Sequence, residues 1–90
     1  MLVEWRPEAR EALFEILDYI AAKNFSAALE LGDEIEHATS CLPEHPYLYR
    51  RGRVPGTREI VVHPNYLVVY RVSLESIQIL TVLHTRQEYP

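Results

Sequence analysis

Residues 57–84 read TREIVVHPNYLVVYRVSLESIQILTVLH, and this stretch decides the fold. It predicts three consecutive antiparallel strands at residues 57–63, 66–72 and 77–84, joined by short connections at 63–66 and 73–76. Val, Ile, Leu, Tyr and Thr dominate these segments, and such side chains suit a pleated, half-buried surface. We expect the residues upstream to cover one face of the resulting sheet.

The last two of these strands are largely apolar on both faces. Side chains alternate along a strand, so residues two apart share a face. In the strand at 66–72 the two sets are Leu67, Val69 and Arg71, and Tyr66, Val68, Tyr70 and Val72. In the strand at 77–84 they are Ile77, Ile79, Thr81 and Leu83, and Gln78, Leu80, Val82 and His84. Ninety residues supply too few elements to cover both faces, so we expect some apolar strand surface to remain for another protein.

Upstream, the pattern predicts a short strand at residues 2–5 and then two helices. Pro7 suits the first position of the first helix, and Asn24 is a plausible stop signal at its end. Ser26 is the expected N-cap of the second helix, which ends before Pro43. Apolar residues recur at spacings of three and four in both helices; the stripes are Ala9, Leu13, Ile16, Leu17 and Ile20, and Ala28, Leu31, Ile35, Ala38 and Leu42.

The order strand, helix, helix, strand, strand, strand predicts an α+β fold in two layers. A helical hairpin packs on one face of a mainly antiparallel sheet. The length allows one domain, so residues 1–90 are expected to form a single unit.

The segment 43–56 is predicted to be a loop, because Pro and Gly recur along it. Loops of this length are often functional. Aromatic side chains interleaved with Arg suit base stacking and phosphate contacts. The alternative is that the tyrosines hold the loop on the sheet and the arginines keep it soluble. The residues concerned are Tyr47, Tyr49, Arg50, Arg51 and Arg53.

The net charge of −4 conceals an asymmetry between the two halves of the chain. Residues 1–46 sum to −7, whereas residues 47–90 sum to +3. Every cation in the second half is an arginine, whose planar fork matches carboxylate or phosphate: Arg50, Arg51, Arg53, Arg58, Arg71 and Arg86. We expect an anionic partner at the sheet end, although a sequence pI near 5.5 argues against docking in an RNA cleft by overall charge.

The apolar runs are too short to cross a bilayer, and no signal-peptide pattern follows Met1. A single cysteine, Cys41, cannot form an internal disulfide. We therefore expect a cytoplasmic protein with no membrane partner. Cys41, His63 and His84 have no metal-ligand spacing, so neither a metal nor another cofactor is expected.

The element order and three segments resemble the RelE/ParE superfamily of type II toxin–antitoxin toxins. The segments are VPGTRE at 54–59, the strand at 66–72 and VLHTR at 82–86. The turn at 44–46 and the ending at 84–90 are more similar to the ParE branch. The resemblance implies a toxin that arrests growth, a role in plasmid stabilisation, and an antitoxin partner.

Two mechanisms follow from this resemblance. ParE-like members bind and poison DNA gyrase, need no catalytic residues of their own, and are favoured here. RelE-like members are ribosome-dependent endonucleases that cut mRNA, which requires proton transfer at the ribose and the leaving oxygen. The candidates for that chemistry are Arg58, His84, Arg86 and Tyr89.

On either mechanism, the target would meet the arginine-rich surface. We expect target binding by Tyr49, Arg50, Arg51, Arg53, Arg58, Arg71 and Arg86, with Arg58 and Arg86 on the open face of the sheet. The antitoxin is expected to wrap the helical hairpin and the exposed sheet surface, with a possible strand added at an edge. The acidic helices suggest that its segment carries basic residues. A non-toxic protein-interaction module remains a third hypothesis.

Overall fold

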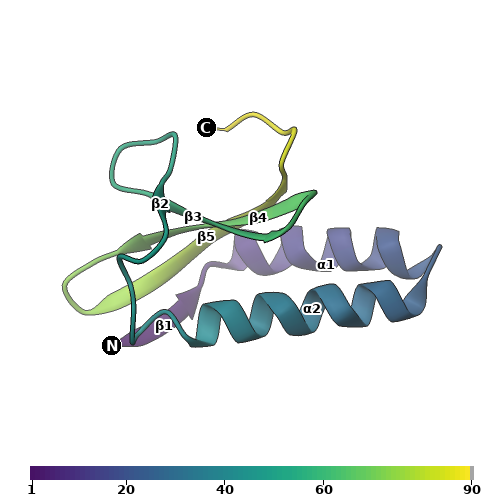
Figure 1. The fold of residues 1–90 in the computed structure, drawn as a ribbon, viewed down its shortest axis with the longest axis horizontal. Helices are drawn as coiled ribbons and strands as arrows, with labels where there is room; N and C mark the ends of the chain where they lie inside the picture. The colour runs from purple at the N-terminus through teal and green to yellow at the C-terminus, as the bar shows by residue number, and fades with distance from the viewer. Residues whose placement is uncertain (90) are drawn as a thin grey trace.

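The computed structural model describes residues 1–89 and has two layers (Figure 1). Both helices lie side by side on one side of a five-stranded sheet, and the C-terminal tail arches over the other side. The elements are β1 (Leu2–Trp5), α1 (Pro7–Ala21), α2 (Phe25–Ser40), β2 (Arg50–Arg51), β3 (Arg58–His63), β4 (Tyr66–Val72) and β5 (Ser76–His84). The predicted α+β fold is confirmed.

The sheet has the strand order β1-β5-β4-β3-β2. β1 pairs with β5 in parallel, and the other three pairings are antiparallel. The predicted strands at 2–5 and 66–72 are confirmed, and the other two differ by one residue at their starts. The predicted loop 43–56 was wrong in one respect, because it contains the two-residue edge strand β2.

The predicted caps between the helices were wrong. α1 ends at Ala21, three residues before the expected stop at Asn24. Asn24 is instead the N-cap of α2: its backbone is extended (φ −156°, ψ 97°), and its side-chain oxygen accepts a hydrogen bond from the Ala27 amide at 3.1 Å. Ser26, the expected cap, lies within the first turn of the helix.

The core lies between the helices and the sheet. Ile35 and Leu42 are fully buried against Val68, Tyr70 and Ile77. The β5 residues that enter the core do not follow the expected alternation, because a bulge shifts the β4–β5 register between Val69 and Tyr70.

The bulge changes which β5 side chains reach the core. Ile77 and Ile79 both lie in the core, as residues two apart on one face should. Beyond the bulge, strict alternation would bring Thr81 into the core, but Val82 lies there instead. An extra residue in one strand moves the following side chains to the opposite face. The predicted division of β5 into two faces was therefore wrong after Leu80.

The open face of the sheet, which carries Leu67 and Val69, is more closed than the sequence suggested. Leu67 and Val69 are 1% and 2% exposed although neither helix covers them. The tail arches over this face in Figure 1. Val61 remains 49% exposed there, so only a small part of the expected apolar surface is free. Larger exposed apolar side chains lie on the helices: Phe14, Tyr19, Phe25 and Leu29. Within residues 1–89, neither helix is long and apolar enough to span a bilayer.

Candidate functional site

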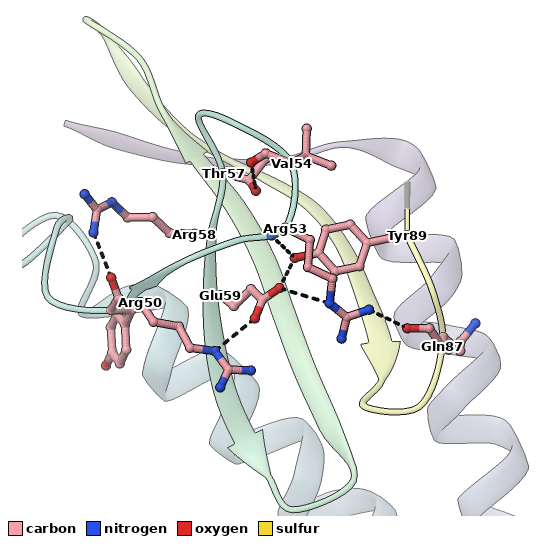
Figure 2. A network of polar contacts seen from close by, with 9 residues as sticks. Arg50, Arg53, Val54, Thr57, Arg58, Glu59, Gln87 and Tyr89 are labelled. Atoms are coloured by element: carbon pink, nitrogen blue, oxygen red, sulfur yellow. Dashed lines mark hydrogen bonds and ion pairs between the residues drawn. The ribbon is translucent and has the colours of Figure 1, made fainter.

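A buried carboxylate organises the arginine-rich end of the molecule. Glu59 is only 4% exposed, and it lies on β3 directly opposite Arg50 of β2. Arg50 Nε donates a hydrogen bond to Glu59 Oε1 at 2.9 Å, and Arg53 Nε lies 3.9 Å from Oε2. The Tyr89 hydroxyl also donates to Oε2. Figure 2 shows these three side chains converging on Glu59 from β2, the following loop and the tail. A buried charge of this kind needs such partners, because burial without them is costly.

The C-terminal tail is held against the β2–β3 loop by Arg53 and Tyr89. The Arg53 amide donates to the Tyr89 hydroxyl at 3.1 Å, and Arg53 Nη1 donates to the Gln87 carbonyl at 2.9 Å. The Arg53 guanidinium also lies 4.8 Å from the centre of the Tyr89 ring. Arg53 is therefore fixed by contacts 34 and 36 residues away in sequence, and the tail helps to set the shape of the loop.

The loop leaves no room for a side chain at residue 52. A Cβ on Gly52 would collide with Thr57 Oγ1 and would lie 3.1 Å from the Tyr89 hydroxyl. The Gly52 amide donates to the Thr57 carbonyl at 2.8 Å, which closes the loop between β2 and β3. Gly56 has φ +84°, a conformation that L side chains rarely adopt.

Arg58 does not lie on the open face with Glu59, contrary to the sequence-based expectation. Its partner in β4 is Tyr70, a core residue on the helix side of the sheet, and paired residues share a face. Arg58 Nη1 donates to the carbonyls of Tyr47 and Tyr49 at 3.2 Å and 2.8 Å. Figure 2 shows Arg58 directed away from the Glu59 cluster.

Tyr70 completes the anchoring of the segment before β2. Its hydroxyl donates to the Pro46 carbonyl at 2.7 Å, and its ring meets that of Tyr49 edge-on at 6.5 Å between centroids. Burial raises the pKa of Tyr70 to about 12, an effect that the nearby Arg58 charge opposes. Tyr49, expected to bind a target, is half-buried and serves this packing.

The arginines are thus divided between the two faces of the sheet. Arg50 and Arg53 lie with Glu59 on one face, and Arg51 lies with Arg58 on the other. Arg71 is half-buried, and its Nε approaches Gly56. Sequence reasoning treated these cations as one surface.

His84 and Arg86 lie at the other end of the sheet. His84 pairs with Tyr66, whose ring it meets edge-on at 5.3 Å, and His84 Nδ1 accepts a hydrogen bond from the Arg86 amide at 3.1 Å. The Arg86 side chain is exposed. Tyr66, the partner of His84, and Tyr70, the partner of Arg58, are four positions apart in β4, which corresponds to about 13 Å of strand.

The four candidates for RNA cleavage therefore occupy three places. His84 and Arg86 are neighbours, Arg58 lies at the far end of β3, and the Tyr89 hydroxyl is bound to Glu59 on the opposite face from Arg58. Cys41, considered with His63 and His84 as a metal ligand, lies at the C-cap of α2, and its sulfur is 4.0 Å from a different histidine, at His37 Nε2.

Glu59 is the residue that sequence reasoning missed. The signal was present, because Glu59 is the one carboxylate in the expected strand at 57–63 and closely follows the arginines at positions 50, 51, 53 and 58. Its partners could not be assigned without β2, which places Arg50 opposite it, and without the path of the tail, which brings Tyr89 to it.

Comparison with known proteins gives a consistent result. Residues 3–89 match the family described as the ParE toxin of type II toxin-antitoxin system, parDE. A candidate toxin of Sinorhizobium fredii, Y4kP, is 36% identical over 89 residues, which cover 98% of this chain and 92% of that protein.

Two solved structures share the fold. A chain of the chromosomal ParDE system from P. aeruginosa superposes with a TM-score of 0.82 at 24% identity, covering 93% of this chain and 95% of its own. A chain of the YoeB dimer from Staphylococcus aureus superposes with a TM-score of 0.65 at 14% identity, covering 99% of this chain and 98% of that chain. Since the family match extends over nearly all of its length, the chain belongs to the ParE toxins of type II toxin–antitoxin systems, within the RelE/ParE superfamily.

Proposed function

We propose that this toxin acts in the cytoplasm by binding DNA gyrase and trapping it on cleaved DNA, and that it is not itself a nuclease. The observation that carries the proposal is the separation of the four RNA-cleavage candidates. A general base, a general acid and a charge-stabilising cation must all reach one phosphate, at hydrogen-bond distances of roughly 2.6–3.2 Å. Arg58 and His84 are about 13 Å apart along the sheet. The membership in the ParE branch supports the same choice.

The alternative is the ribosome-dependent cleavage of mRNA. The pair formed by His84 and Arg86 is the observation that favours it, since the imidazole of His84 accepts a hydrogen bond from the Arg86 amide and the Arg86 side chain is an exposed cation beside it. Against it, a net charge of −4 gives no general attraction to RNA.

Expression of the toxin alone and with its antitoxin in bacteria separates the three hypotheses. Gyrase poisoning predicts growth arrest with linearised plasmid and a DNA-damage response. Rapid loss of intact transcripts with undamaged plasmid would instead favour RNA cleavage. Undisturbed growth at a verified protein level would leave only the non-toxic interaction module.

The antitoxin of this module is proposed to bind the helical hairpin. A groove of about 360 Å³ lies between α1 and α2, and its lining is mainly apolar, with two carboxylates, Asp33 and Glu36, and one cation, Arg10. Leu29, one of the residues that line the groove, is exposed, and so is Phe14, which follows the lining residue Leu13 on α1. An antitoxin segment that combines apolar and basic residues complements this surface, as the acidic helices suggested. The groove residues are Trp5, Arg10, Leu13, Leu17, Ala28, Leu29, Gly32, Asp33, Ile35, Glu36 and Thr39.

Leu29→Lys tests this assignment, because Leu29 is 55% exposed and its replacement leaves the core intact. We expect the variant to remain toxic while co-expressed antitoxin no longer restores growth. Leu74→Lys is the matched control, since Leu74 is 99% exposed in the β4–β5 turn. Equal neutralisation of both variants would contradict the assignment.

A further inference from the structure

Two arginines face each other across neighbouring strands on the helix side of the sheet. Arg51 of β2 pairs with Arg58 of β3, and like charges at directly opposed positions repel each other. In the adjacent pair, by contrast, Arg50 and Glu59 carry opposite charges and form an ion pair. Within residues 1–89, both ion pairs of the structure go to Glu59, on the other face. The charge of Arg51 and Arg58 is therefore not balanced by a carboxylate of the described chain.

Arg58 is held in one orientation, which lowers the entropy cost of ordering it when a ligand binds. The hydrogen bonds that it makes within residues 1–89 use Nη1 alone, toward the carbonyls of Tyr47 and Tyr49. Its guanidinium also lies 5.0 Å from the centre of the Tyr47 ring. These contacts fix one edge of the planar fork. Arg51, in contrast, is exposed and is free to adjust to a ligand.

Both arginines line a groove of about 440 Å³ at the β2–β3 loop. No Asp or Glu is among the residues that line it. The rigid loop with Gly52 and Gly56 forms one wall. Two guanidinium forks around a hollow without carboxylates suit an anion with several oxygens, because each fork can donate two parallel hydrogen bonds.

We propose that this groove binds a phosphate group of a DNA backbone, bridged by Arg51 and Arg58, and that Arg50 and Arg53 do not share this role. The choice of DNA rests on the proposed function, since a toxin on a gyrase–DNA complex lies beside exposed phosphates. The groove itself does not depend on gyrase. A site that neutralises one phosphate implies weak binding with a shallow salt dependence, with a slope of log K against log salt of about −1.

The test compares neighbouring arginines that point to opposite faces. Binding of a labelled 20-base-pair duplex is measured by fluorescence anisotropy at several salt concentrations for the native protein, Arg51→Gln and Arg50→Gln. Both variants lose one positive charge from the same two-residue strand. We expect Arg51→Gln to weaken binding about tenfold and to make the slope shallower, with a much smaller effect on both from Arg50→Gln. Equal losses from the two variants, or no binding by the native protein, would overturn the proposal.

Thermal unfolding with inorganic pyrophosphate provides a second readout that is independent of DNA. Pyrophosphate should raise the melting temperature of the native protein and of Arg50→Gln, but not that of Arg51→Gln. At low salt without the anion, Arg51→Gln should melt higher than the native protein, because the opposed charges are gone. Stabilisation by pyrophosphate without duplex binding would overturn the assignment to DNA.

Gyrase assays keep this proposal separate from the proposed function. Duplex binding through Arg51, in a protein that does not affect gyrase, would support the groove and overturn the gyrase mechanism. Gyrase poisoning that survives in Arg51→Gln, with duplex binding equal in all three proteins, would overturn the groove and support the mechanism.

Discussion

Removal of one hydroxyl, in Tyr89→Phe, should loosen the arginine-rich end of the molecule. That oxygen donates to Glu59 and accepts from the Arg53 amide. A hydrogen bond to a charged group contributes about 1.5–3 kcal/mol, and Glu59 is too buried for water to replace the lost donor easily. The hydrogen bond from the Arg53 amide to this hydroxyl is exposed to water and should contribute less to stability. We expect a loss of about 2 kcal/mol in the free energy of unfolding, which for a chain of this size lowers the melting temperature by roughly 10 °C.

Urea unfolding followed by circular dichroism measures this change. Tyr47→Phe is the matched control, because Tyr47 is 63% exposed and its ring can still lie beside Arg58, so its change should stay within about 0.5 kcal/mol. In a double-mutant cycle with Glu59→Gln, Tyr89→Phe should show a coupling of at least about 1 kcal/mol. A loss below about 0.5 kcal/mol for Tyr89→Phe, or additive effects in the cycle, would refute the anchoring of the tail by Glu59.

Three further outcomes are expected from the fold. Leu42→Ala should cost about 2–5 kcal/mol in urea unfolding because Leu42 is fully buried, whereas Leu74→Ala, at a 99% exposed position, should change stability by less than about 0.5 kcal/mol. Gly52→Ala should lower the melting temperature, because the added methyl group collides with Thr57 Oγ1 and the loop must shift; an unchanged melting temperature would contradict this packing. Stability should fall as the pH rises from about 10 to about 12, since the unfolded chain loses the Tyr70 proton near pH 10 while the folded protein keeps it until about 12; Tyr70→Phe should remove that part of the alkaline decline in a pH series of unfolding curves.

The periodicity of apolar residues was sufficient to predict the elements that bury a continuous apolar stripe. β4 begins and ends where its alternation predicts, and Pro7 opens α1 as its missing N–H allows. Boundaries that depend on one hydrogen bond were not predictable. Asn24 and Ser26 are both good caps, and only the backbone geometry of the turn shows that Asn24 is used.

The candidate site was less predictable because it is made by long-range contacts. The bulge between Val69 and Tyr70 has no signature in sequence, yet it decides which β5 residues reach the core. A two-residue strand such as β2 has too few side chains to show a period, and it alone places Arg50 and Arg51 on opposite faces. The distribution of charge along the sequence correctly placed most cations in the second half of the chain, but it could not show that Glu59 pairs with only some of them.

The gyrase mechanism is tested most directly by the purified protein with DNA gyrase, ATP and relaxed plasmid, followed by detergent and protease treatment and electrophoresis. We predict that linear plasmid accumulates with toxin concentration and that antitoxin added beforehand prevents it. Normal supercoiling without linear product, together with cleavage of mRNA by the same preparation in a translating extract, would contradict the mechanism.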